Sequence, residues 1–157
     1  MPNAKDSPGV YVPPPLIYVA IFFLSLLIEK ILPLDRSFFN TLPAHILGIV
    51  FIIVALFLNV PAILQFIKTK NTLVTIKPAK SLQTSGIYTI SRNPMYLSLL
   101  LLYTGLGFLT GNWWTLLLLP ILTTIVTYFV IQREERYLER AFGKTYLDYK
   151  EKVRRWI

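Results

Sequence analysis

One uncharged stretch constrains this chain more than any other feature. No aspartate, glutamate, lysine or arginine occurs from Asn93 to Gln132, and the run is closed by Arg133-Glu134-Glu135-Arg136. A membrane span needs roughly 20 residues, so a run of about 40 is too long for one span and suits two. The natural break is Gly111-Asn112. Two helices joined there form an antiparallel hairpin, whose two ends return to the same side.

The hairpin predicts that residues at its two ends become neighbours. Arg92, Asn93 and Tyr96 stand at its start, and Glu134 and Glu135 follow its second helix. We therefore expect these side chains to face one another at one membrane surface. Their meeting point is the candidate active site.

Composition supports a membrane protein and excludes several kinds of site. Of the 157 residues, 54% are hydrophobic and only 15% charged, whereas soluble domains carry about 25% charged residues. There is no cysteine, which excludes disulfides, thiolate metal sites and a cysteine nucleophile. The single histidine, His45, cannot build a metal site alone, so no metal site is predicted. The net charge of +8 sits in blocks beside apolar runs, a pattern typical of membrane orientation and not of nucleic-acid binding.

The expected fold class is all-α: a polytopic membrane protein with four transmembrane helices and a C-terminal amphipathic surface helix. Residues 1–157 would form a single membrane-embedded domain, with the candidate site over about 80–157. The spans are predicted at about 15–32, 44–67, 94–110 and 112–131. Pro61 predicts a kink in the second helix. Asn93 is placed to cap the third, with Pro94 at its first position.

The tail after Gln132 carries one apolar stripe at helical spacing, formed by Leu138, Phe142, Tyr146, Tyr149 and Val153. Gly143 is expected to interrupt it as a cap or bend. We interpret this tail as a helix lying on the membrane surface, with Tyr146 and Tyr149 as interfacial aromatic residues and not as ligand contacts.

The basic residues predict the orientation. With four spans, both termini, the 68–92 loop and the tail share one side, and the other side keeps only Lys30 and Arg36 of the 16 basic residues. The positive-inside rule then predicts that both termini and the candidate site are cytoplasmic. His45 begins the second helix on the opposite side, which argues against a histidine base.

The residues at the candidate site suit a particular kind of chemistry. Gly86 permits a tight turn, Tyr88 and Tyr96 offer rings and hydroxyls, and Arg92 can hold a carboxylate or phosphate. No nucleophile–base pair, P-loop or Gly-x-Gly-x-x-Gly pattern is evident. A site of this kind favours a reaction whose reagent is already activated. Methyl transfer from a sulfonium cofactor is such a reaction, in which positioning supplies much of the rate.

These residues also resemble a known family. Thr84-Ser85-Gly86-Ile87-Tyr88, Arg92-Asn93-Pro94-Met95-Tyr96, Glu134-Glu135 and Phe142-Gly143-x-x-Tyr146-x-x-Tyr149 resemble the isoprenylcysteine carboxyl methyltransferase family of integral membrane enzymes. The resemblance implies S-adenosylmethionine as methyl donor, a cytoplasmic cofactor pocket, and a lipophilic acceptor that enters from the bilayer between helices.

Carried over by residue, the resemblance implies a cofactor site and a reacting end. The reacting end would hold Arg92 and Glu135. Cofactor contacts would come from Lys80, Ser81, Leu82, Gln83, Gly86, Tyr88, Asn93, Pro94, Met95, Tyr96 and Glu134. Family members commonly have histidine where this chain has Asn93, and the eukaryotic enzymes have a substrate-gripping arginine where this chain has Val130. The second departure argues against a prenylcysteine substrate.

The functional hypothesis is therefore a membrane methyltransferase that moves a methyl group from S-adenosylmethionine to a lipid-like or small hydrophobic acceptor, with a carboxylate as one possible acceptor group. The alternatives are a phospholipid amine N-methyltransferase and a non-catalytic membrane protein that keeps the fold. A transporter is disfavoured, because the last two spans carry no ionisable side chain of the kind that marks ion pathways. Simpler interpretations also stand beside these: Arg92 as an interface anchor, and Glu134-Glu135 as a solvated helix face.

Overall fold

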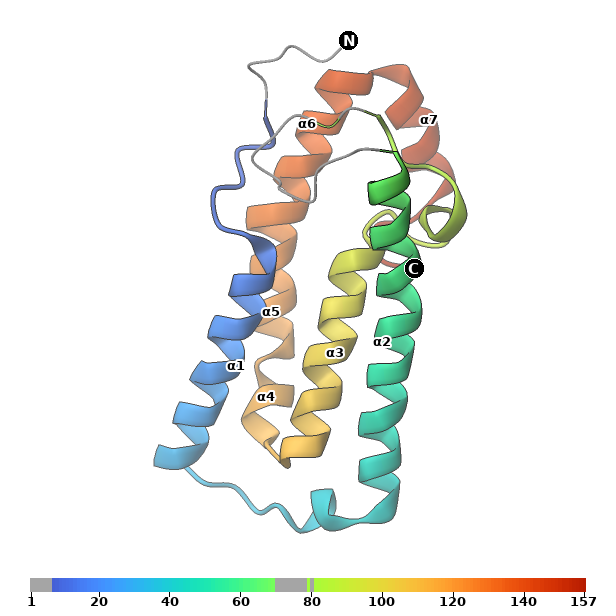
Figure 1. Cartoon of the computed structure of the whole chain (residues 1–157). Coiled ribbons are helices and arrows are strands. Elements are labelled where there is room, and N and C mark those ends of the chain that lie inside the picture. Colours follow the sequence, from blue (N-terminus) through green and yellow to red (C-terminus); the bar gives the residue numbers. More distant parts are fainter. Residues whose placement is uncertain (1–6, 70–78, 80) are drawn as a thin grey trace.

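The computed structural model of the chain describes residues 7–69, 79 and 81–157, and the described part is all-α (Figure 1). Its helices are α1 (Pro14–Ile31), η1 (Ser37–Asn40), α2 (Leu42–Lys68), η2 (Gly86–Thr89), α3 (Pro94–Thr110), α4 (Trp113–Leu117), α5 (Leu119–Val126), η3 (Thr127–Ile131), α6 (Gln132–Phe142) and α7 (Lys144–Lys152). The expected all-α class is confirmed.

The long helices form an antiparallel bundle in which α3 lies between α1 and α2, and α4 and α5 lie between α1 and α3 in the view of Figure 1. α2 packs on α3 through glycines: a Cβ at Gly105 would lie 2.8 Å from the Gly48 carbonyl oxygen. The faces of α2 that do not contact α3 lie outside the bundle, and Phe57 on α2 is 73% exposed. An exposed surface of that kind suits lipid and not water.

Two helices, α1 and α2, are long and apolar enough to cross a membrane by length and composition, and α3 is a shorter apolar helix. α2 is continuous through Pro61, so the predicted kink does not interrupt it. The predicted helix over 112–131 exists as three consecutive pieces, α4, α5 and the π-helical turn η3. The arrangement as four membrane spans remains a prediction.

The hairpin turn is built as its glycine and asparagine require. Gly111 ends α3 in the left-handed conformation at φ 64°, and the Asn112 side chain accepts hydrogen bonds from the backbone N–H groups of Trp114 and Thr115. At this end of the bundle, the indole N–H of Trp113 donates to the Asp35 carbonyl and that of Trp114 to the Leu32 carbonyl, both at 2.8 Å. These bonds tie the turn to the α1–α2 connection.

The tail differs from its prediction. Gly143 does separate two helices, at φ 52° and ψ −128°, a conformation that favours glycine. The apolar stripe, however, packs on the protein: Tyr146, Tyr149 and Val153 are buried with Ala62 and Tyr88 in one cluster. Helical spacing shows that a face is apolar but not what covers it, so the expectation that this stripe faces the membrane was wrong. That the tail lies at the membrane surface remains a prediction.

Candidate functional site

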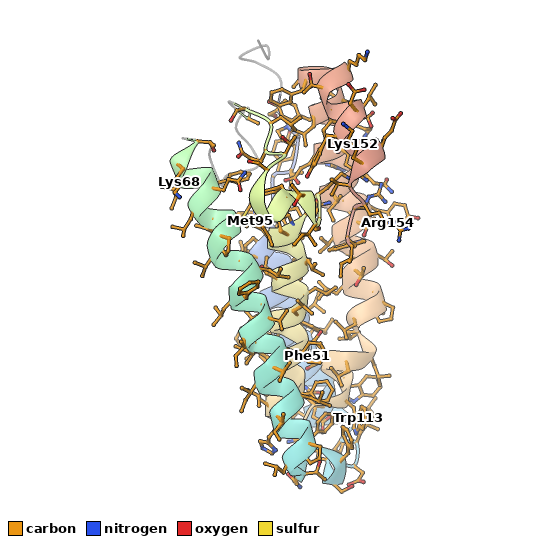
Figure 2. The ribbon with its side chains drawn as sticks, turned by 90° about the vertical axis from the view of Figure 1, so that its right-hand side faces the viewer. Phe51, Lys68, Met95, Trp113, Lys152 and Arg154 are labelled. Atoms are coloured by element: carbon orange, nitrogen blue, oxygen red, sulfur yellow. The ribbon has the colours of Figure 1, made fainter. Side chains whose placement is uncertain are left out.

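A cavity of about 290 Å³ lies at the end of the bundle where α6 and α7 fold over α2 and α3. Figure 2 shows Lys68 and Met95 at this end of the molecule and Trp113 at the other. The wall of the cavity is formed by residues at and before the start of α1, by α2, by Ala79 and residues 81–83, by η2, by the first turns of α3, and by α6 with α7. The residues that line it are Pro8, Pro14, Pro15, Asn59, Ile63, Phe66, Ala79, Ser81, Leu82, Gln83, Tyr88, Arg92, Asn93, Pro94, Met95, Tyr96, Leu99, Glu134, Glu135, Tyr137, Leu138, Tyr146 and Tyr149.

The two ends of the hairpin meet in this cavity. The Tyr96 hydroxyl donates to Glu134 Oε1 at 2.6 Å, and Arg92 Nη2 lies 3.2 Å from Glu135 Oε1. The predicted approach of Arg92 and Tyr96 to the two glutamates is therefore confirmed. It follows from the antiparallel path of α3 and the helix that runs from Leu119 through η3 into α6.

Glu134 has an unusual environment for a carboxylate. The pKa of Glu134 is raised from 4.5 to about 7, and burial is the largest cause. The negative charge of the neighbouring Glu135 also raises this pKa. The hydrogen bond from Tyr96 acts in the opposite direction and lowers it. Near neutral pH this group therefore exchanges between its neutral and charged forms. A cation bound nearby would favour the charged form.

Glu135 is held by arginines. The Arg155 guanidinium donates to it twice, from Nε to Oε1 at 2.9 Å and from Nη2 to Oε2 at 2.7 Å, in the planar fork that suits a carboxylate. Arg92 contacts the same carboxylate, and the side chains of Arg92 and Glu135 are each only 8% exposed. Neither the interface-anchor interpretation of Arg92 nor the solvated-face interpretation of Glu135 fits such burial.

The turn before α3 is fastened to the C-terminal segment. The Arg92 backbone N–H donates to the Arg154 carbonyl at 3.1 Å, and the Asn93 side-chain amide donates to the Arg155 carbonyl at 3.0 Å. Asn93 therefore does not cap α3 as expected, since its side chain makes no capping hydrogen bond. The Tyr149 hydroxyl also donates to the Tyr88 carbonyl at 2.6 Å, which joins η2 to α7.

Three residues that line this cavity each carry a buried polar atom that has no hydrogen-bond partner within the described part of the chain: Asn59 Oδ1, the Tyr88 hydroxyl and Arg92 Nε. Leaving such groups unpaired costs about 1–3 kcal/mol each, and more for a charged group. All three border one cavity. A ligand that offers both donors and acceptors would satisfy them.

The structure brings most predicted site residues together. Eleven of the thirteen predicted positions line the cavity: Ser81, Leu82, Gln83, Tyr88, Arg92, Asn93, Pro94, Met95, Tyr96, Glu134 and Glu135. Gly86 does not line it. It forms the turn at φ 61°, where a Cβ would lie 2.8 Å from the Gln65 side chain. Lys80 lies outside the described residues. The functional roles of all these residues remain predictions.

Sequence reasoning missed two parts of the wall. Asn59, Ile63 and Phe66 fall on one face of α2, at the spacing i, i+4, i+7, and a single asparagine in that apolar face was the available signal. Tyr146 and Tyr149 line the cavity although they were interpreted as interfacial aromatic residues. Arg155 was also missed, because nothing in the sequence pairs it with Glu135.

Fold and site together define an α-helical protein with membrane-length apolar helices and an amphipathic cavity at one end. The chain belongs to the phospholipid methyltransferase family, whose family model matches residues 43–145. That family consists of membrane methyltransferases that use S-adenosylmethionine, and it belongs with the isoprenylcysteine carboxyl methyltransferase-like enzymes; membership of the narrower isoprenylcysteine family is not shown.

The chain is also similar to an uncharacterized protein of Haemophilus influenzae. The two are 46% identical over 63 residues, which is 40% of this chain and the whole of that relative. No solved structure matches the chain.

Proposed function

We propose that this protein is an integral membrane methyltransferase that moves a methyl group from S-adenosylmethionine to a lipid-like or small hydrophobic acceptor. The observation that carries the proposal is the set of unpaired atoms of Asn59, Tyr88 and Arg92 around one cavity that Glu134 and Tyr96 also line. Family membership supports the same class of reaction.

The residues of the cavity fit the proposed cofactor. The lining supplies carboxylate, hydroxyl and guanidinium groups, and apolar side chains such as Leu82, Met95 and Phe66 form much of the remaining wall. Such a mixture suits a ligand that has both a charged end and an apolar ring face. When bound, S-adenosylmethionine supplies a methyl group on a positively charged sulfur.

The chain's own groups would hold and orient the two reactants. Glu134, in its charged form, would attract a cationic ligand, and the Tyr96 hydroxyl would hold the Glu134 carboxylate in place. Arg92 would orient an anionic group, because its Nε–H is buried and unpaired in the described part of the protein. Rate enhancement would come from positioning and from exclusion of water.

The chemistry of the acceptor decides whether a base is required. A carboxylate acceptor needs none. An ammonium must first lose a proton, and Glu134, with its pKa of about 7, is suited to accept it. The family match therefore keeps a phospholipid amine as the second candidate acceptor.

Calorimetry of the detergent-purified protein with S-adenosylhomocysteine tests the proposal. We expect binding by the unchanged protein and loss of binding in Glu134→Ala with the helical circular dichroism retained. Glu139→Ala is the matched control, because Glu139 lies on the same helix but pairs with Lys150 outside the cavity. Absence of binding by the unchanged protein would favour a non-catalytic protein that keeps the fold.

The acceptor itself can be found by labelling. Membranes from cells that lack the gene would be incubated with purified protein and methyl-tritiated S-adenosylmethionine. Label in the lipid extract that depends on Glu134 would identify the acceptor class. Radioactive methanol released by mild base would indicate a methyl ester, and label that stays non-volatile would indicate an N-methyl group.

A further inference from the structure

Arg155 reaches the site from outside the cavity wall. It is 33% exposed and does not line the cavity, yet its guanidinium holds both oxygens of Glu135 while its carbonyl accepts from Asn93. The backbone carbonyls of residues 154 and 155 thus accept hydrogen bonds from the Arg92 backbone N–H and the Asn93 side-chain amide, and they hold the turn that carries Arg92.

The charges of this group do not cancel. Glu135 is one anion between two cations, Arg92 and Arg155, so the three side chains carry one net positive charge. If Glu135 paired with Arg92 alone, the pair would be neutral. Because Arg155 takes the fork of the carboxylate, Arg92 is left with a single contact to Glu135, at 3.2 Å, and with a buried Nε–H that has no partner in the described residues.

The remaining groups around Arg92 do not neutralise that charge. The Tyr146 hydroxyl lies 3.5 Å from Nη1, and burial raises the pKa of Tyr146, so this residue stays neutral. Glu134 is engaged by Tyr96 and is only partly charged near neutral pH. The cavity therefore presents a positive, hydrogen-bond-donating corner at Arg92.

We propose that Arg155 is a positioning residue that takes up the charge of Glu135 and thereby makes Arg92 an oxyanion-binding subsite of the cavity. The oxyanion is a carboxylate or phosphate oxygen, and it comes either from the amino-acid end of the cofactor or from the phosphodiester of a lipid acceptor. The role in methyl transfer rests on the proposed function, whereas the subsite itself does not.

Binding measurements with two pairs of probes separate the sources. The first pair is S-adenosylhomocysteine and 5′-methylthioadenosine, which lacks the carboxylate, measured by calorimetry. The second pair is phosphatidylglycerol and diacylglycerol, which lacks the phosphodiester, measured by native mass spectrometry of the detergent-solubilised protein. Arg155→Gln should weaken binding of the anionic probe that occupies the subsite about tenfold, as expected for loss of a charge-assisted contact. It should leave binding of 5′-methylthioadenosine and diacylglycerol unchanged.

Matched variants distinguish this role from simple structural support. Arg154→Gln removes the same charge at the adjacent exposed position and should bind as the unchanged protein does. Glu135→Gln removes the counter-charge and should keep or tighten anion binding, whereas a purely structural pair would lose it in both variants. Arg155→Lys, which keeps the charge but not the fork, serves if Arg155→Gln does not fold, and should weaken the same anionic probe by a smaller factor.

Several results would overturn the subsite. The first is that Arg155→Gln and Arg154→Gln bind every probe equally well. The second is that Arg155→Gln and Glu135→Gln lose anion binding to the same extent. The third is that the unchanged protein binds no anionic probe. Arg155-dependent binding of phosphatidylglycerol without any binding of S-adenosylhomocysteine would support the subsite and remove the methyltransferase proposal.

Discussion

Glu134 and Glu135 are adjacent in sequence but occupy opposite environments. Glu134 is buried beside a tyrosine hydroxyl, and its pKa is raised to about 7, whereas Glu135 is surrounded by the guanidinium groups of Arg155 and Arg92. Environments that differ in this way let two carboxylates perform different tasks at one pH. Glu134 can exchange a proton near neutral pH, whereas Glu135 holds the guanidinium groups of Arg92 and Arg155.

The raised pKa of Glu134 predicts how stability depends on pH. Between about pH 4.5 and 7 the folded protein keeps the Glu134 proton and the unfolded chain loses it, so this residue makes the fold less stable as pH rises through that window. Relative to the unchanged protein, Glu134→Gln should therefore gain about 3 kcal/mol in free energy of unfolding between the two ends of the window.

Thermal unfolding in detergent as a function of pH measures this change. Glu139→Gln is the control, because Glu139 is paired at the surface of the same helix. A gap between Glu134→Gln and the unchanged protein that stays constant across pH would contradict the assignment.

Tyr96→Phe is predicted to raise the pKa of Glu134 above its present value. The hydroxyl donates to the carboxylate and so favours its charged form, an effect that phenylalanine cannot supply. Infrared spectra of the protonated carboxyl band as a function of pH measure the shift. Tyr103→Phe, in the same helix but away from the cavity, should leave the band unchanged; a lower pKa in Tyr96→Phe would count against the assignment.

At the residue scale, the sequence predicted which side chains lie close together at the site, but not all of their hydrogen-bond and ion-pair partners. Arg92, Tyr96 and the two glutamates could be brought together because they flank one uncharged run of known length. The pairing of Glu135 with Arg155 could not, since a short loop and the bend at Gly143 decide where the C-terminal segment lies. The unpaired oxygen of Asn59 requires coordinates, because pairing is a three-dimensional property.

Among the elements, the π-helical turn η3 has the clearest link to the site. It occupies Thr127–Ile131, directly before α6, and Val130 and Ile131 within it are buried. A π turn contains one residue more than the α-helical turn it replaces, and such turns are frequent at functional sites. Because it lies directly before α6, we infer that it sets the rotation at which Glu134 and Glu135 leave the helix toward the cavity.

Deletion of Phe129 should convert this turn to regular α-helix. Because successive residues are rotated by roughly 100°, the deletion would turn the two glutamates away from Tyr96 and Arg92. We expect loss of S-adenosylhomocysteine binding with helical content retained. Phe129→Ala keeps the register, and its side chain is 59% exposed, so it should bind normally. Normal binding by the deletion variant would show that η3 does not set the register.

The helix positions were largely predictable, and the irregularities were not. α3 was predicted with its observed bounds because Asn93-Pro94 and Gly111 punctuate it. Leu118 and the π turn interrupt the second half of the hairpin without any charge or glycine to mark them. The tail stripe had the right period but the wrong partner, since α2 and η2 cover it instead of lipid.

For the whole molecule, the open question is its orientation in the membrane. The site, α6 and α7 lie at one end of the bundle, and the Trp113 turn lies at the other (Figures 1 and 2). The distribution of basic residues predicts that the site end is cytoplasmic.

Single cysteines test this orientation cleanly, because the chain has none of its own. Lys152→Cys should react with a membrane-impermeant maleimide only after cells are opened, whereas Asn40→Cys should react in intact cells. Both positions are exposed. Labelling of Lys152→Cys in intact cells would reverse the orientation.

Residues from Pro8 to Tyr149 line the cavity, and the segment after α7 holds Glu135 and the turn before α3 from outside it. During synthesis, the apolar helices therefore leave the ribosome while Glu135 still lacks its arginine fork and the turn before α3 is unfastened. We therefore expect a nascent chain that has not yet reached residues 154 and 155 to lack these contacts around the cavity. Completion of the site would thus follow synthesis of the segment after α7 and come later than synthesis of the apolar helices.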